Sequence, residues 1–279
     1  MKIDQEVLPA DVAIAISGVG ATKAPGDDLL ANSLLKACNE EGNLARVLAP
    51  LIQASFELGY YPRRFRHAIV IILRKAGKTA EDLKHPSAYR PIALLSATGK
   101  LFEVIITKRI SEAAEENRLL PELQFGFRAH RSTDMAVRVV TDVVHTAWAR
   151  KAFASLLQLD LTGAFDRVEW THLYHTLREM GFQRWLVLWL VSYNTDRTGS
   201  LHFDSVTSAP CPITQGTPQG SPLSPVLFIL FITTLYTDLA RIHGLITVGF
   251  ADDTNLLATN RKPDAYYKIL EEAIRVYNA

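Results

Sequence analysis

Two adjacent carboxylates, Asp252 and Asp253, have the types and positions that point most directly to chemistry. They follow Gly249-Phe250-Ala251 and stand between two apolar segments, ITV before them and NLLA after them. Paired aspartates also occur in plain exposed turns, because Asp tolerates turn geometry. Here both flanking segments are apolar enough to be buried strands, so two carboxylates at the tip of the hairpin would repel each other unless cations offset them. Hard divalent ions, which take oxygen ligands, meet that need.

A third carboxylate, Asp160, ends the apolar run 154–159, which is expected to be a strand. Its plain interpretation is a strand-end acid in water. If that strand lies beside the hairpin in one sheet, Asp160 joins Asp252 and Asp253 at one sheet edge. Such a cluster can hold two divalent ions about 4 Å apart, the arrangement for in-line phosphoryl displacement. One ion would activate an attacking 3′-hydroxyl, and the other would neutralise a triphosphate and the leaving pyrophosphate.

The charge distribution is compatible with a nucleic-acid enzyme. The 279 residues carry 30 Lys+Arg against 29 Asp+Glu, but residues 60–151 hold 17 basic and 9 acidic residues, so the remainder is net acidic. A basic part can hold phosphates while an acidic part holds metal ions. Charge asymmetry alone is weak evidence and needs the motifs beside it.

Composition excludes several classes of protein. With 48% hydrophobic residues and a net charge of +1 the chain is not intrinsically disordered. Cys38 and Cys211 cannot make a disulfide framework or a cysteine-rich zinc site. The start lacks a basic segment leading into an apolar block, so no signal peptide is expected. The longest apolar runs, 185–191 and 226–235, are far shorter than the roughly 20 residues that span a bilayer. We therefore expect an intracellular protein with no membrane partner.

The elements that must position these residues follow from periodicity and from Gly and Pro positions. Helices are predicted over residues 29–38, 44–58, 99–110, 169–180 and 183–193. Strands are predicted over 68–73, around 90–92, and over 154–159, 245–250 and 254–258. Residues 210–225 are rich in proline and are expected to be largely loop. A soft boundary is expected near Arg150, where the basic part ends.

Seven sequence blocks in a fixed order carry a family resemblance. They are KAPGDD at 23–28, AIVIILRKAGK at 68–78, YRPIALLSATGKLFE at 89–103, LPELQFGFRAHRST at 120–133, LQLDLTGAFDRV at 157–168, TPQGSPLSPVLF at 217–228 and GFADD at 249–253. From residue 23 onward the chain resembles the reverse transcriptase domain of non-LTR (LINE-type) retrotransposons. The resemblance implies an α+β right-hand polymerase core. Residues 1–150 would form the fingers with N-terminal helices, and residues 151–279 a palm with a small antiparallel sheet backed by helices, the thumb being absent.

The resemblance also implies roles for single residues. The family's catalytic, metal-binding aspartates match Asp160, Asp252 and Asp253, which would hold two Mg²⁺ ions, with Mn²⁺ as a substitute. An aromatic steric gate matches Phe165, whose ring would leave no room for a 2′-hydroxyl; a core aromatic is the alternative. The remaining positions that match contacts to the incoming nucleotide are Lys75, Arg90, Gln219 and Gly220.

The block QFGFRAHRS interleaves aromatic and basic residues, a pattern that suits a single template strand. Template-binding candidates are Phe127, Arg128 and Arg131. A fingers loop whose phenylalanines are merely buried explains the same pattern equally well.

The activity implied by the resemblance is that of an RNA-directed DNA polymerase. Its partners would be an RNA template, a DNA primer, dNTPs and the remainder of the element's protein or its RNA. A nuclear location follows only from the retrotransposon assignment.

Departures from the family pattern leave alternatives open. Residues 27–29 read Asp-Asp-Leu where the family usually has Pro-Asp-Gly, and the chain is expected to be a fragment of a larger element protein or a decayed copy. Three rival interpretations remain. They are an RNA-dependent RNA polymerase, a group II intron-type maturase reverse transcriptase, and a decayed, non-catalytic nucleic-acid-binding remnant.

Overall fold

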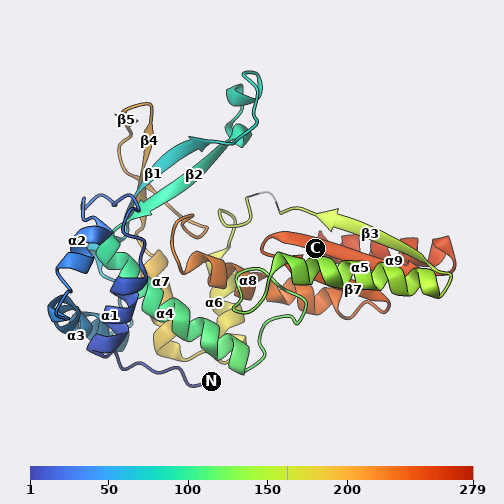
Figure 1. The fold of residues 1–279 in the computed structure, drawn as a ribbon, viewed down its shortest axis with the longest axis horizontal. Coiled ribbons are helices and arrows are strands. Elements are labelled where there is room, and N and C mark those ends of the chain that lie inside the picture. The colour runs from blue at the N-terminus through green and yellow to red at the C-terminus, as the bar shows by residue number, and fades with distance from the viewer. Residues whose placement is uncertain (162, 279) are drawn as a thin grey trace. The chain divides into compact units, whose positions relative to one another are not determined.

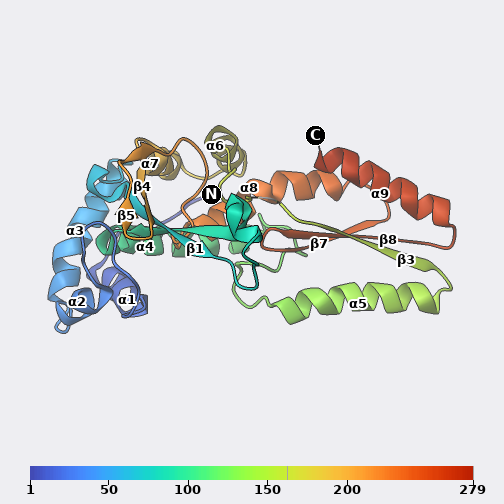
Figure 2. The ribbon, with the colours of Figure 1, turned by 90° about the horizontal axis from the view of Figure 1, so that it is seen from above.

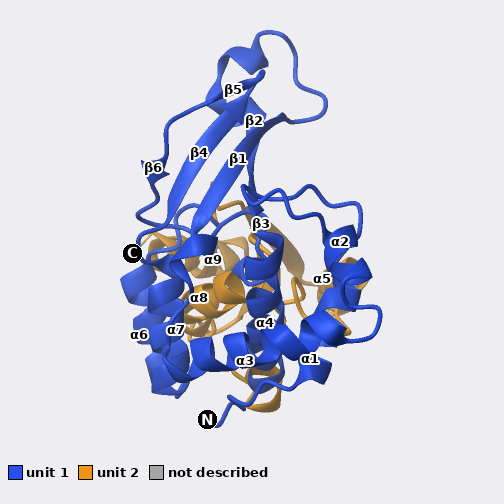
Figure 3. Cartoon of the chain, turned by 90° about the vertical axis from the view of Figure 1, so that its left-hand side faces the viewer, with its two compact units in different colours: residues 1–113, 165–224 blue, residues 114–164, 225–279 orange. Residues whose placement is uncertain are grey.

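The computed structural model describes residues 1–161 and 163–278, arranged in two compact units (Figure 3). Unit 1 comprises residues 1–113 and 165–224, and unit 2 comprises residues 114–164 and 225–279. Each unit is therefore built from two separate stretches of chain, and the expected boundary near Arg150 falls inside unit 2. The assignment of fingers to residues 1–150 and palm to residues 151–279 stays a prediction.

Unit 2 is organised around an antiparallel sheet of three strands, in the order β3 (Phe153–Leu159), β8 (Asp253–Asn260) and β7 (Leu245–Phe250). The register pairs Leu159 with Thr254 across β3 and β8, and Phe250 with Asp253 across β7 and β8. The strand that precedes Asp160 thus lies directly beside the hairpin that carries the other two aspartates. The small antiparallel sheet expected from the family resemblance is confirmed.

Helices cover both faces of this sheet (Figure 2). On one face, Leu257 packs with Val248 and Phe125 against α5 (Thr133–Ala149). On the other face, Leu256 packs against the end of α8 (Ser224–Leu239) and α9 (Pro263–Tyr277). Because successive side chains of a strand point to opposite faces, a strand buried on both faces needs continuous apolar residues. This requirement accounts for the apolar run that follows Asp253.

Unit 1 combines helices with a second sheet (Figure 1). Its helices are α1 (Pro9–Gly18), α2 (Asn32–Ala37), α3 (Asn43–Glu57), α4 (Ala97–Glu116, whose last turn enters unit 2), α6 (Trp170–Glu179) and α7 (Arg184–Asn194). The strands β2 (Tyr89–Leu95), β1 (His67–Arg74), β4 (Thr198–Phe203) and β5 (Val206–Thr207) follow one another across the sheet, and β6 (Cys211–Pro212) also pairs with β4. The β1–β2 hairpin is antiparallel, whereas β4 pairs with β1 in parallel.

The core of unit 1 is aromatic. Tyr61, Trp189 and Tyr193 are fully buried, with Trp189 stacked on Tyr193 at 5.7 Å and Tyr61 edge-on to both. Each such ring buries a large apolar area, and edge-to-face pairs add a favourable quadrupole term. The apolar runs at 185–191 and 226–235 are largely buried, as expected for core segments. None of the helices in the described residues is both long enough and apolar enough to cross a membrane.

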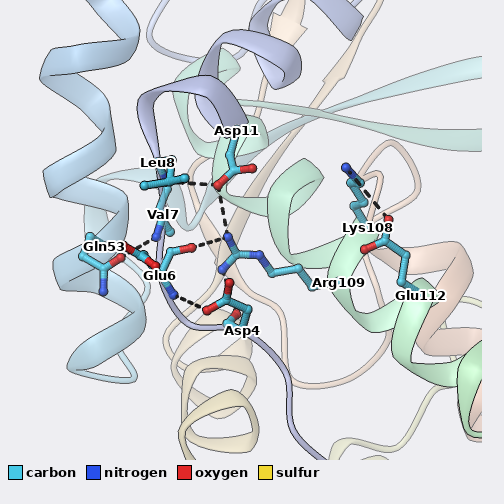
Figure 4. A network of polar contacts seen from close by, with 9 residues as sticks. All are labelled: Asp4, Glu6, Val7, Leu8, Asp11, Gln53, Lys108, Arg109 and Glu112. Atoms are coloured by element: carbon cyan, nitrogen blue, oxygen red, sulfur yellow. Dashed lines mark hydrogen bonds and ion pairs between the residues drawn. The ribbon is translucent and has the colours of Figure 1, made fainter.

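An arginine fixes the N-terminal segment to α4 (Figure 4). Arg109 donates to the carbonyls of Asp4, at 2.9 Å, and Glu6, and to the Asp11 carboxylate at 3.3 Å. That carboxylate also accepts from the backbone N–H of Leu8, just before α1. Because the side chain of Arg109 is only 12% exposed, these are charge-assisted bonds with little screening.

Candidate active site

The strand register brings the three aspartates to one end of the sheet in unit 2. Asp253 is the first residue of β8, Asp252 occupies the turn before it, and Asp160 follows β3 immediately. Asp160 and Asp253 both line a cavity of about 410 Å³ on the α5 side of the sheet. Polar side chains of Thr133, Gln158 and Asn255 are also in its wall. The strand on which the prediction depended, the one before Asp160, thus lies beside the hairpin, while the metal-binding role of the three carboxylates stays a prediction.

The electrostatics agree with this convergence. The pKa of Asp253 is raised above its ordinary value, first because of desolvation and then because of repulsion from Asp252 and Asp160. A carboxylate near like charges is harder to ionise. The three side chains are therefore close enough to interact, and each would gain from a nearby cation.

The donor type at this end of the sheet fits a hard divalent ion, since carboxylate oxygens are the preferred ligands of Mg²⁺. The raised pKa of Asp253 marks the excess negative charge that such an ion would offset. As the side chains stand, however, no three His, Cys, Asp or Glu residues in the described part of the chain lie close enough together to hold a metal ion. The carboxylates are thus suitable donors, but the ligand set is not preassembled.

The turn that carries Asp252 is held in an unusual backbone conformation. Ala251 has φ of 57°, in the left-handed region that non-glycine residues rarely adopt, and only 8% of it is exposed. Strained residues of this kind persist only where the surroundings determine them. Here the surroundings are residues 123–126, which read LQFG and overlap the block QFGF at 124–127.

Residues 123–126 lie along β7 and make main-chain hydrogen bonds to it. Phe125 N–H donates to Gly249 O at 2.8 Å, and Gly249 N–H donates to Leu123 O at 2.9 Å. Gly126 packs so closely on the turn that a Cβ there would lie 2.6 Å from Ala251 Cα and would overlap the Ala251 nitrogen. Only glycine permits this approach of two backbones.

Gln124 completes the support of the turn and was missed by sequence reasoning. Its side chain is fully buried, donates to Ala251 O at 3.2 Å and accepts from Gly126 N–H at 2.9 Å. Since buried polar groups need partners, these two bonds fix the amide and the turn together. The signal in the sequence was the unusual order of a polar residue between two apolar ones in a glycine-containing block.

The template-binding candidates have mixed surroundings. Arg128 is almost buried and forms a bidentate pair with Glu115, at 2.7 and 2.6 Å, while it also donates to Pro121 O and Gln124 O. Arg131 donates to Glu122 O and lies over the Phe125 ring. Phe127 has φ of 58° and is 46% exposed. The guanidinium of Arg128 is thus committed to the fold, and contacts of all three residues with a template stay predictions.

Unit 1 holds all five of the nucleotide-binding candidates. Gln219 donates from its side chain to both oxygens of Asp166 at 3.2 Å, and Thr217 N–H donates to Phe165 O at 2.8 Å. Gln219 O accepts from Ala93 N–H of β2 at 2.6 Å. The structure therefore bonds Gln219 both to Asp166, the neighbour of Phe165, and to β2, the strand that also carries Arg90.

Gly220 and the two basic candidates lie on the same structural frame. Gly220 has φ of 130°, and a Cβ there would overlap the carbonyl oxygen of Ala93. Arg90 pairs with Leu73 in the β1–β2 ladder, and Lys75 lies two residues beyond Leu73. Lys75 lies one residue past the end of β1, where its backbone N–H donates to Ala88 O at 2.9 Å. A cavity of about 240 Å³ nearby is lined by Pro91, Asp166, Arg197 and Gln219 among others.

A small antiparallel sheet with converging carboxylates, together with a β-hairpin and a Pro-Gln-Gly loop, is the arrangement of a nucleic-acid polymerase core. The family model for "Reverse transcriptase (RNA-dependent DNA polymerase)" matches residues 74–279. The chain therefore belongs to the reverse transcriptase family, and the resemblance drawn from the seven blocks is confirmed.

Relatives with assigned names refine this assignment. The chain is 29% identical over 271 residues to the RNA-directed DNA polymerase from mobile element jockey of Drosophila melanogaster, covering 96% of this chain and 29% of that protein. It is 33% identical over 246 residues to the probable RNA-directed DNA polymerase from transposon X-element of the same species, covering 88% of this chain and 26% of that protein. The chain thus spans less than a third of the length of these relatives.

Among solved structures, the fold is similar to that of an apo telomerase from Candida tropicalis truncated from its C-terminal domain. The TM-score is 0.50 at 15% identity, and the match covers 77% of this chain and 47% of that one. At this identity the likeness concerns the fold alone, and it confirms the expected α+β polymerase core.

Proposed function

We propose that this chain carries the catalytic core of a retrotransposon RNA-directed DNA polymerase, which adds deoxynucleotides to a primer 3′-hydroxyl on an RNA template. The observation that carries the proposal is that Asp160, Asp252 and Asp253 lie at one end of the adjacent strands β3 and β8, where desolvation and then repulsion from the other two carboxylates raise the pKa of Asp253. Family membership supports the reaction class. The three aspartates would hold two Mg²⁺ ions, which when bound neutralise the triphosphate and lower the pKa of the attacking hydroxyl.

The chain's own residues have separate tasks in this proposal. Lys75, just past β1, and Arg90, on β2, would supply positive charge for a triphosphate, and Arg can bind it bidentately. Gln219 and Gly220 present a backbone and an amide to the sugar or base. The Phe165 ring would exclude a 2′-hydroxyl, so that deoxynucleotides are preferred.

The partners in this proposal are an RNA template, a DNA primer and dNTPs, together with the remainder of the element's protein or its RNA. Similarity to proteins named for the jockey and X-element mobile elements supports a retrotransposon source. A nuclear place of action follows from that source.

The test is single-nucleotide extension of a DNA primer on an RNA template, with dNTP or rNTP and with or without Mg²⁺. We expect magnesium-dependent dNTP addition by the wild-type chain, and loss of at least a hundredfold in Asp252→Asn. Asp142→Asn is the matched control, because Asp142 is an exposed residue of α5 in the same unit.

Two results would contradict the proposal. RNA binding without any dNTP addition, unchanged by Asp252→Asn, would favour the non-catalytic remnant. Equal use of rNTP and dNTP would refute the role of Phe165 and favour an RNA-dependent RNA polymerase.

A further inference from the structure

Unit 1 contains a fully buried acid that the proposed chemistry does not use. Glu103, on α4, has no exposed surface. It accepts hydrogen bonds from the Tyr61 hydroxyl at 3.1 Å and from the Ser221 hydroxyl. Acids are almost never fully buried unless they are paired or satisfied by other polar groups. An ordinary role in the stability of the fold would be served better by an apolar residue of similar size.

The direction of the hydrogen bonds shows which group depends on Glu103. Ser221 Oγ accepts from the Tyr193 hydroxyl at 3.1 Å and from Leu223 N–H at 3.0 Å. Its two acceptor sites are filled, so its single proton is donated to Glu103. With Tyr61 donating as well, both oxygens of Glu103 act as acceptors. Loss of either acceptor therefore leaves a buried hydroxyl unpaired.

A buried cation lies on the other side of Tyr193. Arg197 is 1% exposed, donates to Tyr193 O at 3.1 Å and lies over the Tyr193 ring at 4.6 Å. Its positive charge favours the ionised form of Glu103, while burial opposes it and raises the pKa of that carboxyl. Arg197 also lines the cavity of about 240 Å³ that contains Gln219. The network thus runs from the helix to the wall of that cavity.

Ser221 ends the segment 217–221, which holds Gln219 and Gly220. The segment is attached at Phe165 through Thr217 N–H and at Ala93 through Gln219 O. These two bonds hold the first part of the segment, whereas the bond from Ser221 to Glu103 holds its last residue. Gly220 adopts φ of 130°, a region that glycine enters without strain, so its backbone alone does not fix the shape of the segment and anchors on both sides are needed.

We propose that Glu103 is a positioning residue of this enzyme, which fixes the Gln219–Gly220 backbone for the incoming nucleotide through its hydrogen bond with Ser221. The expected effect on nucleotide affinity rests on the proposed polymerase function. The hydrogen bonds by which Glu103 holds the segment do not depend on that function. It assigns Glu103 no contact with substrate.

The test compares Glu103→Gln with Glu112→Gln, an exposed position on the same helix. An amide accepts through its oxygen only and carries no charge, so the bond from Ser221 is lost in one orientation of the amide and weakened in the other. We expect KM for dNTP to rise about tenfold, with kcat and primer–template affinity within about twofold of wild type. Ser221→Ala should give a similar rise, and the double variant should add little to it, because both changes remove one interaction. Tyr193→Phe, which keeps the ring, replaces Glu103→Gln if that variant proves too unstable to assay. It should give a smaller rise in KM for dNTP, about threefold.

Hydrogen–deuterium exchange gives a readout that does not need activity. In Glu103→Gln we expect the amides of residues 217–224 to exchange about tenfold faster, while those of α3 keep their wild-type rates. The proposal is overturned if Glu103→Gln lowers only Tm and leaves KM and the exchange of residues 217–224 as in Glu112→Gln. If the wild-type chain adds no nucleotide, the proposed function fails, and the exchange measurement alone decides the role of Glu103.

Discussion

Replacing Gly126 by alanine tests whether the QFGF block supports the aspartate turn. The added Cβ would lie 2.6 Å from Ala251 Cα and 3.0 Å from Phe250 C. These are backbone atoms, which cannot rotate away as a flexible side chain would, so the two segments must separate. Separation weakens the bonds of Phe125 N–H and Leu123 O to Gly249, and that of Gln124 to Ala251.

The expected cost follows from these contacts. Three hydrogen bonds at about 0.5–1.5 kcal/mol each set an upper range of about 1.5–4.5 kcal/mol. Overpacking without separation would cost about 1–3 kcal/mol. Of separation and overpacking, the one with the lower free-energy cost will occur, so we expect the free energy of unfolding to fall by about 2 kcal/mol and Tm to fall by about 4–8 °C. Displacement of the turn by about 1 Å would also lower nucleotide addition about a hundredfold.

The assay is thermal unfolding by circular dichroism, combined with hydrogen exchange at the amides of Phe125 and Gly249. Gly18→Ala is the control, because a Cβ there meets nothing within 4 Å and the position is at the end of α1. That change should be neutral or slightly stabilising, since alanine favours helix. If Gly126→Ala unfolds at the same temperature as the control and both amides stay protected, the support assigned to this block is refuted.

Three further changes test other contacts. Arg128→Met should lower the free energy of unfolding by about 2 kcal/mol, as measured by chemical denaturation. It should also remove the part of the loss of stability below about pH 4.5 that comes from Glu115, because the hydrogen bond from Arg128 lowers the pKa of that carboxyl; an unchanged pH profile would contradict this. Asp253→Asn should raise Tm by about 1–3 °C above wild type at pH 7 and leave it unchanged at pH 3, since the raised pKa shows that the ionised acid is unfavourable in the folded protein. The rise is small because the position is exposed, and a Tm equal to that of wild type at both pH values would contradict the prediction. Gly220→Ala should cost about 1–3 kcal/mol, because its Cβ overlaps the Ala93 carbonyl; a stability equal to wild type would show that the loop moves freely.

Much of the fold near the site could be predicted from local pattern. The apolar runs before Asp160 and around Asp253 gave β3, β7 and β8 to within a residue or two, because a strand buried on both faces must be continuously apolar. The prediction of a helix over 29–38 was too long, since only residues 32–37 are helical. The prediction of a helix over 44–58 agrees with α3, whose apolar residues recur at three and four.

Helix α5 was not predicted because its local preferences oppose it. It is rich in valine and threonine, which lose side-chain freedom in a helix. The Ser132 side chain caps its N-terminus by accepting from Met135 N–H, and Val140 and Val143 pack on the sheet. Tertiary burial therefore decides the conformation of this segment, and burial cannot be read from a window of adjacent residues.

Glu103 and Gln124 could not be assigned from sequence for a related reason. Both are polar residues, which are ordinarily exposed, in segments whose motif identity suggested no role for them. Their meaning depends on partners far along the chain: Gln124 bonds Ala251, 127 positions away, and Glu103 bonds Ser221, 118 positions away. A single sequence contains no record of such pairs.

The two buried side chains share a physical logic. The turn at Ala251 has a positive φ that is costly for alanine unless the surroundings determine it, and the loop at Gly220 has a positive φ that glycine adopts freely but does not fix by itself. Each is bonded by one fully buried polar side chain from a distant segment, through a carbonyl in one case and a hydroxyl in the other. An apolar side chain could fill the same space but could not specify the position of a single backbone atom. The hydrogen bonds of Gln124 and Glu103, which offset the desolvation of these side chains, therefore stabilise one conformation of each segment over its alternatives, a gain in specificity that the free energy of unfolding alone does not measure.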